Sequence, residues 1–481
     1  MLQAQCPVSA KIQLSGSTFD EDNRTLASMM KNSSQSSLTR SFNFCFTILA
    51  TLLLAKSASA LTSNQHPLLE KNPKTPVFAD LALLNAAGIR AITVESSTQV
   101  GYAEITNHEQ SMLSQKAHEW NRCGGYEDLS LVFGSPSPTN HLAPTQNASP
   151  GRSNLADDHR MSEINLALRD LAIRQSKDQQ YEFSHRLTSV PPIAMRAEVK
   201  AAVEQVSEQN IKDTVAFYSA FHTRYNKGAT PNEAPEALKV RIETLLKTSK
   251  IPYTIEFISH QSTQQKSVHV RLIGKLRPNE IVVLGGHLDS INVSWFGNDA
   301  APGADDNASG TADLIEALRI VIGMEQPERT LDFFWYAGEE SGLLGSAEIA
   351  KTYKSAKSDV IGVMQLDMTL HPGAGEFVLG SMTDFTSSWM RSYLTDLNTL
   401  YIHAKVVEDK CGYGCSDHAS WYRQGYPTLM PFEATFNTMN PNLHTANDIV
   451  NAKSDFAHSA MFAKIAVAIA EDLGNSNERE P

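Results

Sequence analysis

The stretch that most constrains this chain runs over residues 281–306. It starts with an apolar segment, residues 281–284, whose β-branched side chains and following glycines favour a buried strand. The segment leads directly into His287, and the paired carboxylates Asp305 and Asp306 come before a segment with helical periodicity. Open α/β sheets bind ligands beyond the carboxyl ends of their strands. We therefore expect a ligand site at this end of the predicted strand.

Three further apolar segments predict strands that end near ionisable residues. Residues 331–337 lead into Glu339 and Glu340, and residues 360–366 lead into Asp367. Residues 428–432 precede a loop that contains His444. A single acid or histidine at such a position is usually a helix cap or a structural group. Several of them at one sheet edge would repel and desolvate one another without cations between them, so together they indicate a metal site.

Histidine nitrogen and carboxylate oxygen are suitable ligands for zinc. One zinc ion needs only three protein ligands, so the larger number of acids predicts two ions that share a bridging carboxylate. Two ions about 3.5–4 Å apart lower the pKa of a bridging water and polarise a carbonyl group. Hydrolysis also needs a proton carrier that is not a ligand, and the pair Glu339-Glu340 can provide one of each. Residue types alone do not decide between Asp305 and Asp306 as ligand, or between the two glutamates as base.

The order of predicted elements indicates the fold class. Strands predicted at residues 251–259 and 267–273 alternate between apolar and polar residues, as expected for an antiparallel edge. The later strands are wholly apolar and are separated by helices, which is typical of a sheet covered on both faces. We therefore expect a three-layer α/β/α sandwich with a mixed, mostly parallel sheet, in which the four apolar strands carry the site. The helices are predicted at residues 198–222, 234–248, 311–322, 343–353, 386–397 and 451–472.

The N-terminal part has a different character. Lys31 and Arg40 precede an apolar run, residues 44–55, which Ala58-Ser59-Ala60 closes in the manner of a secretory signal peptide. Because signal peptides begin at the initiator, translation is expected to start at Met29 or Met30. This gives an upstream extension at residues 1–29, a signal peptide at 30–60, a polar pro-region at 61–189 and a catalytic domain at 190–475. Residues 79–121 of the pro-region have enough apolar content for a small fold.

Secretion also bears on the cysteines and on the binding partners. In an oxidising compartment, Cys411 and Cys415 are expected to form a small disulfide loop, since no second cysteine pair completes a zinc site. The net charge of −12 argues against a nucleic-acid partner and against a membrane surface held by basic residues. The apolar run is too short for a stable anchor. The protein is expected in the periplasm or outside the cell, as a monomer.

Taken together, GGHLDS, APGADDNASG, AGEESGLLGS, QLDMT, CGYGCSDHASW and NLHT resemble the motifs of the secreted bacterial leucyl aminopeptidases. These are two-zinc exopeptidases of the glutamate carboxypeptidase-like clan, and the resemblance covers residues 190–473. It implies hydrolysis of the first residue from peptides with a free N-terminus, with a preference for leucine-like side chains. The polar pro-region predicted above implies a pro-enzyme that a processing protease activates.

The resemblance assigns roles that the residue types leave open. It implies that Asp306 bridges two zinc ions, one held also by His287 and Asp367 and the other by Glu340 and His444. Glu339 would be the general base and Tyr413, inside the disulfide loop, would donate to the oxyanion. Asp289 would orient the imidazole of His287. The apolar pocket for the first residue of the substrate would be lined by Met368, Phe432, Phe436, Met439 and Leu443.

Three alternatives are weaker. Related carboxypeptidases usually insert a dimerisation domain between the acidic motifs and the last histidine, and the segment between Asp367 and His444 leaves no room for one. Glutaminyl cyclases bind one zinc, whereas five ligand positions are present here. A non-catalytic binding module of the same fold would have lost ligands or the base.

The remaining histidines and one cysteine need separate treatment. His418 is expected to be structural, and His371, His403 and His458 are expected at the surface. Cys123, in Asn-Arg-Cys-Gly-Gly, could bind the zinc site of the precursor as a thiolate until the pro-region is removed. An ordinary structural thiol is the alternative.

Overall fold

The computed structural model describes residues 74–93, 100–119, 126–128, 193–292, 299–373 and 378–476. The predicted signal peptide, Cys123 and residues 293–298 of the loop between His287 and the acidic pair lie outside these residues. The described residues form a small N-terminal fold and the larger domain that carries the predicted site. Among them, no helix has both the length and the apolar character needed to cross a membrane.

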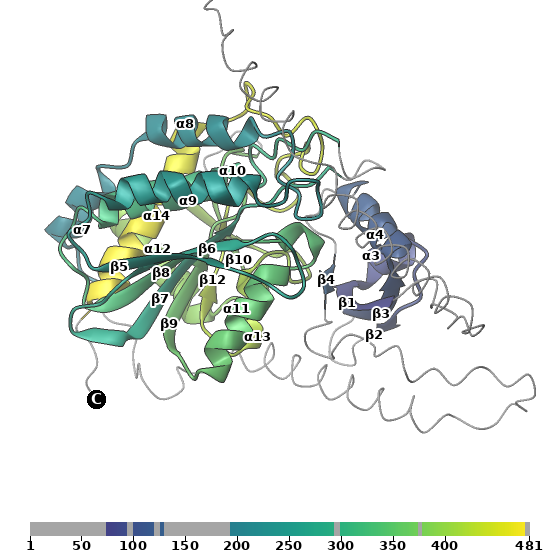
Figure 1. The fold of residues 1–481 in the computed structure, drawn as a ribbon, viewed down its shortest axis with the longest axis horizontal. Helices are drawn as coiled ribbons and strands as arrows, with labels where there is room; N and C mark the ends of the chain where they lie inside the picture. The colour runs from purple at the N-terminus through teal and green to yellow at the C-terminus, as the bar shows by residue number, and fades with distance from the viewer. Residues whose placement is uncertain are drawn as a thin grey trace, which may run out of the picture. The chain divides into compact units, whose positions relative to one another are not determined.

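A mixed six-stranded sheet forms the centre of the larger domain (Figure 1), in the order β12-β9-β7-β8-β6-β5. The four strands β12, β9, β7 and β8 are parallel to one another, whereas β6 and β5 are antiparallel at one edge. The predicted mixed, mostly parallel sheet with an antiparallel edge is therefore confirmed. The bounds of the strands are β5 Tyr253–Ile258, β6 Ser267–Leu272, β7 Arg277–His287, β8 Arg329–Tyr336, β9 Asp359–Gln365 and β12 Thr428–Leu429.

The central strands are buried on both faces, which explains why their sequences are continuously apolar. Successive residues of a strand point to opposite faces of the sheet. In β7, Val282 and Leu284 belong to the large core on one side of the sheet, whereas Ile281 and Val283 belong to a second core on the other side. The sheet therefore lies between two helical layers, as the apolar strands predict.

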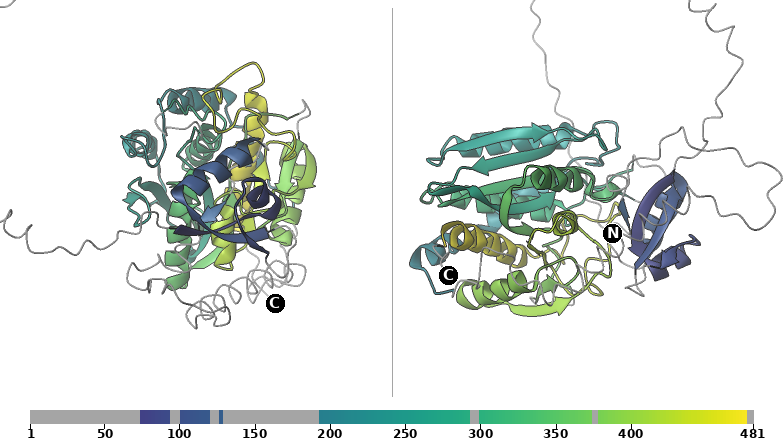
Figure 2. Two further views of the ribbon diagram at one scale, coloured as in Figure 1. Left: turned by 90° about the vertical axis from the view of Figure 1, so that its right-hand side faces the viewer. Right: turned by 90° about the horizontal axis from the view of Figure 1, so that it is seen from below.

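The two helical layers differ in size. Helix α14 packs along α10, and α12 contacts α14 on the same side (Figures 1 and 2). The larger layer also contains α7, α8 and α9, and the opposite layer contains α11 and α13. The helices are α7 Ala197–Val203, α8 Glu208–Ser219, α9 Glu233–Leu246, α10 Ala308–Val321, α11 Leu344–Ser355, α12 Ser388–Leu397, α13 His418–Arg423 and α14 Phe456–Asn475.

Two of the predicted elements are divided in the structure. The helix expected over residues 198–222 is two helices, α7 and α8, because Ser207 accepts a hydrogen bond from Asn210 N and begins a new helix. The strand expected over residues 428–432 belongs to two sheets, since β12 pairs with β9 but β13 (Pro431–Phe432) pairs with β10. Proline has no N–H group for a continuing ladder, so a change of sheet at Pro431 is physically reasonable.

The sheet that receives β13 was not predicted. It has three strands in the order β11-β10-β13, with β10 at Val378–Met382 and β11 at Lys405–Asp409. Strand β11 is only partly buried, so its sequence lacks a clear apolar period.

The small fold lies where residues 79–121 predict one. Its elements are β1 Lys74–Asp80, α3 Leu81–Ala86, β2 Ile92–Thr93, β3 Val100–Thr106, α4 Asn107–Glu119 and β4 Glu127–Asp128. The four strands are antiparallel in the order β2-β3-β1-β4, which is the order of a split β-α-β unit of the ferredoxin-like type. Asp80 caps α3 by accepting from Leu83 N, and Val77, Leu84 and Ile105 contribute to a separate buried core.

We predict that Arg329→Met lowers the free energy of unfolding by about 3–5 kcal/mol, because it removes a buried guanidinium that pairs with the largely buried carboxylate of Glu280. Arg329 is fully buried, donates to Glu280 Oε2 at 2.7 Å and also donates to the carbonyl of Leu473 at 2.6 Å. It thereby joins β7, β8 and α14. Urea unfolding of both proteins at one pH would measure the difference.

Lys200→Met is the control for this prediction. Lys200 forms an exposed ion pair with Glu204 one helical turn away, and such pairs contribute about 0.5 kcal/mol. If Arg329→Met were no more destabilising than Lys200→Met, the buried pair would not hold the sheet to α14.

Candidate metal centre

The predicted ligands come together at one edge of the central sheet. His287 is the last residue of β7, and Asp306 lies between β7 and α10. Glu340 lies in a short 3-10 turn, Glu339–Ser341, that follows β8. Asp367 follows the end of β9, and His444 lies in the loop after β13. The carboxyl ends of three parallel strands therefore supply the site, in agreement with the sequence pattern.

Five side chains form two groups that share one member. His287 Nε2 lies 3.1 Å from Asp306 Oδ1 and 3.2 Å from Asp367 Oδ1. His444 Nε2 lies 3.0 Å from Asp306 Oδ2 and 2.9 Å from Glu340 Oε2. Each group could hold a metal ion, and all five residues are buried. The two oxygens of Asp306 face different groups, so this carboxylate is shared by both.

The electrostatics of the site favour positive charge. Burial alone would lower the pKa of His287 and of His444, but the neighbouring carboxylates outweigh burial and raise both pKa values well above the usual value. Burial would raise the pKa of Asp306, yet the two histidines beside its carboxylate lower it. For Glu340, burial and the nearby charge of Asp306 raise the pKa to about 7. Bound metal cations would neutralise the negative charge of these carboxylates, which protons neutralise otherwise.

Glu339 differs from Glu340 in its surroundings. It belongs to neither ligand group, although it is buried next to them. Burial raises the pKa of Glu339 well above its usual value, and the charge of Glu340 adds to this, while His287 opposes it. A buried carboxylate with a raised pKa beside a metal site has the properties of a general base.

Asp289 and Ser416 support the ligands from outside the two groups. Asp289 Oδ1 lies 3.5 Å from Nδ1 of His287, on the side of the ring that faces away from Asp306 and Asp367. Its two oxygens also accept from the backbone N–H groups of Glu339 (3.1 Å) and Glu340 (3.3 Å). The hydroxyl of Ser416 donates to Asp367 Oδ2 at 2.6 Å. Asp289 therefore contacts both the first histidine and the turn that carries the glutamates.

Comparison with known proteins agrees with this geometry. The family model described as peptidase family M28 matches residues 267–469. Leucine aminopeptidase 1 of Aspergillus oryzae is 35% identical over 290 residues, which cover 57% of this chain and 74% of the relative. The chain belongs to peptidase family M28. Together these findings support a metallo-aminopeptidase, a hydrolase that acts on peptide bonds.

Solved structures show the same fold. The LapA aminopeptidase of Legionella pneumophila aligns with a TM-score of 0.67 at 23% identity, over 85% of this chain and 100% of that chain. LapB of the same organism aligns with a TM-score of 0.66 at 25% identity, over 83% of this chain and 99% of that chain. Similar proteins thus include fungal relatives in sequence and bacterial ones in structure.

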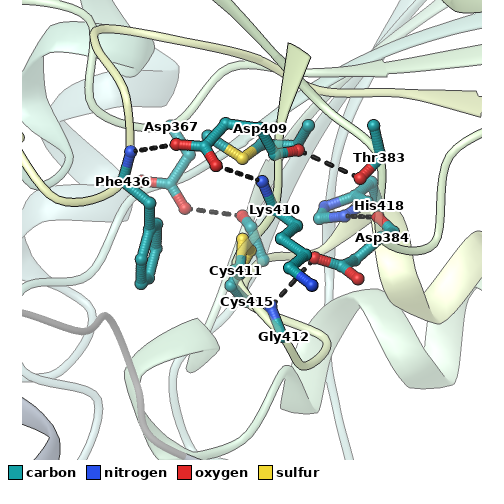
Figure 3. Close-up of a disulfide and its surroundings, with 12 residues drawn as sticks. Asp367, Thr383, Asp384, Asp409, Lys410, Cys411, Gly412, Cys415, His418 and Phe436 are labelled. Atoms are coloured by element: carbon teal, nitrogen blue, oxygen red, sulfur yellow. Dashed lines mark hydrogen bonds between the residues drawn. A yellow bond between two sulfur atoms is a disulfide. The ribbon is translucent and has the colours of Figure 1, made fainter. Parts of the chain in front are cut away.

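The loop that carries Tyr413 is closed by a disulfide between Cys411 and Cys415 (Figure 3). The carboxylate of Asp384 accepts from Gly412 N at 2.9 Å, and its carbonyl accepts from His418 Nε2 at 3.1 Å. Tyr413 itself is buried. The loop therefore has fixed attachments on both sides of the tyrosine.

The five predicted pocket residues gather around this loop. All of them are buried in one apolar cluster with Tyr413 and the disulfide, and Met382 and Met430 belong to the same cluster. Met368, which follows the ligand Asp367, and the ligand His444 have left-handed backbone conformations, with φ of 55° and 57°. Such conformations in non-glycine residues concentrate at functional sites.

A second group of acids, which the sequence pattern does not predict, lies behind the candidate ligands. Asp448 accepts from the backbone N–H groups of Asp305 and Asp306, the latter at 2.9 Å, and so fixes the chain at the bridging carboxylate. Glu433 accepts from His371 N at 2.7 Å and from Asn440 N at 2.8 Å. Burial raises the pKa of Asp448 and Glu433 well above the usual values. Asp448 lies close to His444 in sequence, which is a weak signal by itself.

The expectations for the other histidines are partly wrong. His403 is exposed and His418 is buried with a structural hydrogen bond, as predicted. His371 and His458, however, are buried rather than at the surface. The ring of His458 donates to the carbonyl of Glu433 at 2.8 Å, and burial lowers its pKa to about 4. A neutral histidine of this kind needs no carboxylate partner, so the sequence carries no sign of its burial.

We predict that Ser416→Ala weakens metal binding by about 10- to 100-fold, because the substitution removes the donor that orients Asp367. A titration of the metal-free protein with zinc, followed by calorimetry, would measure the change. Ser420→Ala is the matched control, since Ser420 is buried, belongs to neither ligand group and accepts from the hydroxyl of Ser346 at 2.9 Å. Equal affinities of the two variants would contradict the supporting role of Ser416.

Proposed function

We propose that this protein is a secreted, zinc-dependent aminopeptidase that removes leucine-like residues from the N-terminus of peptides and is made as a pro-enzyme. The observation that carries the proposal is the pair of ligand groups joined by Asp306, with Glu339 beside them but outside both. The family, and the names of the relatives, support the peptidase activity.

The donor atoms of this chain fit zinc. The ligand atoms are histidine nitrogens and carboxylate oxygens, which suit zinc and number three in each group. Several buried atoms of the groups make no hydrogen bond within the described residues, among them Asp306 Oδ2, both carboxylate oxygens of Glu340 and His444 Nε2. Buried polar atoms are rarely left in that condition without an ion or water. We propose two zinc ions, one held by His287, Asp306 and Asp367 and the other by Asp306, Glu340 and His444.

When bound, the ions would acidify a water molecule and polarise the scissile carbonyl. The carboxylate of Glu339 would take the proton of this water as it attacks, and would then deliver the proton to the leaving amine. The hydroxyl of Tyr413 would donate to the oxyanion that forms on the substrate. Asp289 would keep His287 in the correct orientation and tautomer. The burial of all these groups would exclude bulk water and strengthen each interaction.

The preference for the first residue follows from the apolar cluster. Met368, Phe432, Phe436, Met439 and Leu443 offer no charged or hydrogen-bonding group to a side chain placed among them. Leucine or methionine would bury apolar surface there, whereas a charged side chain would lose its hydration without compensation. We propose that this cluster lines the binding site for the first residue of the substrate.

Secretion and processing remain proposals from the sequence. The signal-like segment at residues 30–60 supports export, either to the periplasm or to the medium. The separate core of residues 74–128 supports a folded pro-region rather than an unstructured leader. We further propose that the protein acts as a monomer on peptides with a free N-terminus.

The decisive experiment compares leucine-p-nitroanilide with its N-acetylated analogue, with and without a chelator. Cleavage of the free-amine substrate alone, abolished by the chelator and restored by zinc, would support the proposal. No cleavage by protein that binds two zinc ions would instead favour a carboxypeptidase, a cyclase or a binding module.

We predict that Glu339→Gln lowers kcat on leucine-p-nitroanilide by about 10²- to 10⁴-fold, because the amide cannot accept the proton of the attacking water. The zinc content, measured by atomic emission, should stay at the wild-type value, since Glu339 belongs to neither ligand group. Glu325→Gln, an exposed glutamate, serves as the control. Loss of zinc from Glu339→Gln would assign Glu339 to the ligands and refute its role as base.

We also predict that removal of residues 61–189 raises the activity of the precursor, because the pro-region is proposed to hold the enzyme inactive. Limited proteolysis followed by the leucine-p-nitroanilide assay would measure the gain. A Cys123→Ser precursor separates the two roles proposed for this thiol. It should be active without cleavage if the thiolate binds zinc, and as inactive as the wild-type precursor if the thiol is only structural.

A further inference from the structure

The turn that carries the two glutamates depends on acceptors from outside it. Gly338 (φ 64°) and Gly342 (φ 106°) flank the 3-10 turn Glu339–Ser341 in left-handed conformations, and the turn has no side-chain cap of its own. The first N–H groups of a helical turn have no partner within it. Since the turn is buried, these groups need acceptors from other elements.

Four consecutive backbone N–H groups here are accepted by side chains. Ala337 N donates to Ser267 Oγ at 2.9 Å and Gly338 N donates to Gln265 Oε1 at 3.0 Å. Glu339 N and Glu340 N donate to Asp289, as described above. The conformation at Glu339 is therefore fixed by three side chains that lie far from it in sequence.

Both polar atoms of the Gln265 side chain form hydrogen bonds in this arrangement. Its side chain is fully buried, and its Nε2 donates to the carbonyls of Arg224 (2.9 Å) and Pro231 (3.1 Å). An N–H group can only donate, so the atom that faces Gly338 N must be the oxygen, and the two carbonyls require the nitrogen. The orientation of this amide follows from its partners.

The same amide joins the turn to the loop of the metal ligands. The buried guanidinium of Arg224 donates to the carbonyls of Leu288 (3.0 Å), Pro302 (2.6 Å) and Gly303 (2.9 Å). These carbonyls lie near the two ends of the loop between His287 and Asp306. Two residues further along, Asn226 Oδ1 accepts from the hydroxyl of Ser341 at 2.8 Å, at the other end of the turn.

We propose that Gln265 and Asn226 are positioning residues for Glu339. They hold its carboxylate at the correct place relative to the ligands His287 and Asp306. The inference rests on the proposed function. Both residues precede residues 267–469, which the family model matches, so neither takes part in that match. A displacement of a catalytic group by about 1 Å can cost about 100-fold in rate.

Gln265→Met tests the inference in the full chain, because methionine has a similar shape but cannot accept from Gly338 N. The expected result is a fall in kcat on leucine-p-nitroanilide of about 10- to 100-fold, with KM and the zinc content unchanged. Ser341→Ala releases the other end of the turn with little change in volume, and kcat should fall by about 2- to 10-fold, the equivalent of one net hydrogen bond. Gln264→Met is the matched control, because Gln264 is the exposed neighbour.

The outcomes separate this inference from the proposed function. Inactive wild-type protein would refute the proposed function, and hydrogen exchange of the peptide around residues 337–341 would then decide the inference by itself. Exchange there should be faster in Gln265→Met than in Gln264→Met. Equal exchange and equal kcat in the two variants would overturn the inference. So would a loss of activity that matches a loss of zinc or of folded protein, because Gln265 would then be merely structural.

Discussion

The structure of the site depends on one carboxylate, Asp306, that faces two histidines from opposite sides. It is unfavourable to gather four more ionisable side chains around it, because each group loses hydration and the acids repel one another. These side chains are His287, Asp367, Glu340 and His444. The raised pKa of Glu340, which burial and the charge of Asp306 cause, expresses this cost. A protein can keep such a group together only if the backbone fixes each member independently. Here the ends of β7, β8 and β9 fix the backbone at or near His287, Glu340 and Asp367. Hydrogen bonds to Asp448 fix the backbone at Asp306.

The division of labour between Glu339 and Glu340 also follows from backbone placement. Successive side chains in a 3-10 turn point in directions about 120° apart, so the turn after β8 separates the two carboxylates. One carboxylate reaches His444, and the other stays outside the ligand groups. Because left-handed glycines flank this turn and its N–H groups are buried, it depends on acceptors from other elements. Its geometry is thus set by tertiary contacts rather than by local preference.

The sequence predicts those features of the fold and site that depend on local pattern. The apolar strands, their helices and the residues at the strand ends follow from periodicity, and so the candidate ligand positions could be predicted, whereas the choice of Asp306 and Glu340 comes only from the family resemblance. Other features depend on contacts between distant segments. The second sheet is built from a partly buried strand, β11, and from a two-residue strand after Met430, neither of which has a strong pattern. His458 and Gln265 are buried through hydrogen bonds to backbone carbonyls, and such partners leave no trace in the sequence around them.

The antiparallel edge of the sheet has a consequence for the site. Parallel strands bring only their carboxyl ends to the edge where ligands bind. Strand β6 runs antiparallel to β8, and Val268 lies opposite Trp335, so the beginning of β6 reaches the same edge as the end of β8. The residues just before β6 are therefore next to the turn of Glu339, although they come from a part of the chain that carries no ligand. A wholly parallel sheet would place the end of a strand there, followed by a helix, and would leave the N–H groups of Ala337 and Gly338 without Ser267 and Gln265. The mixed sheet thus provides the acceptors that the turn of Glu339 requires.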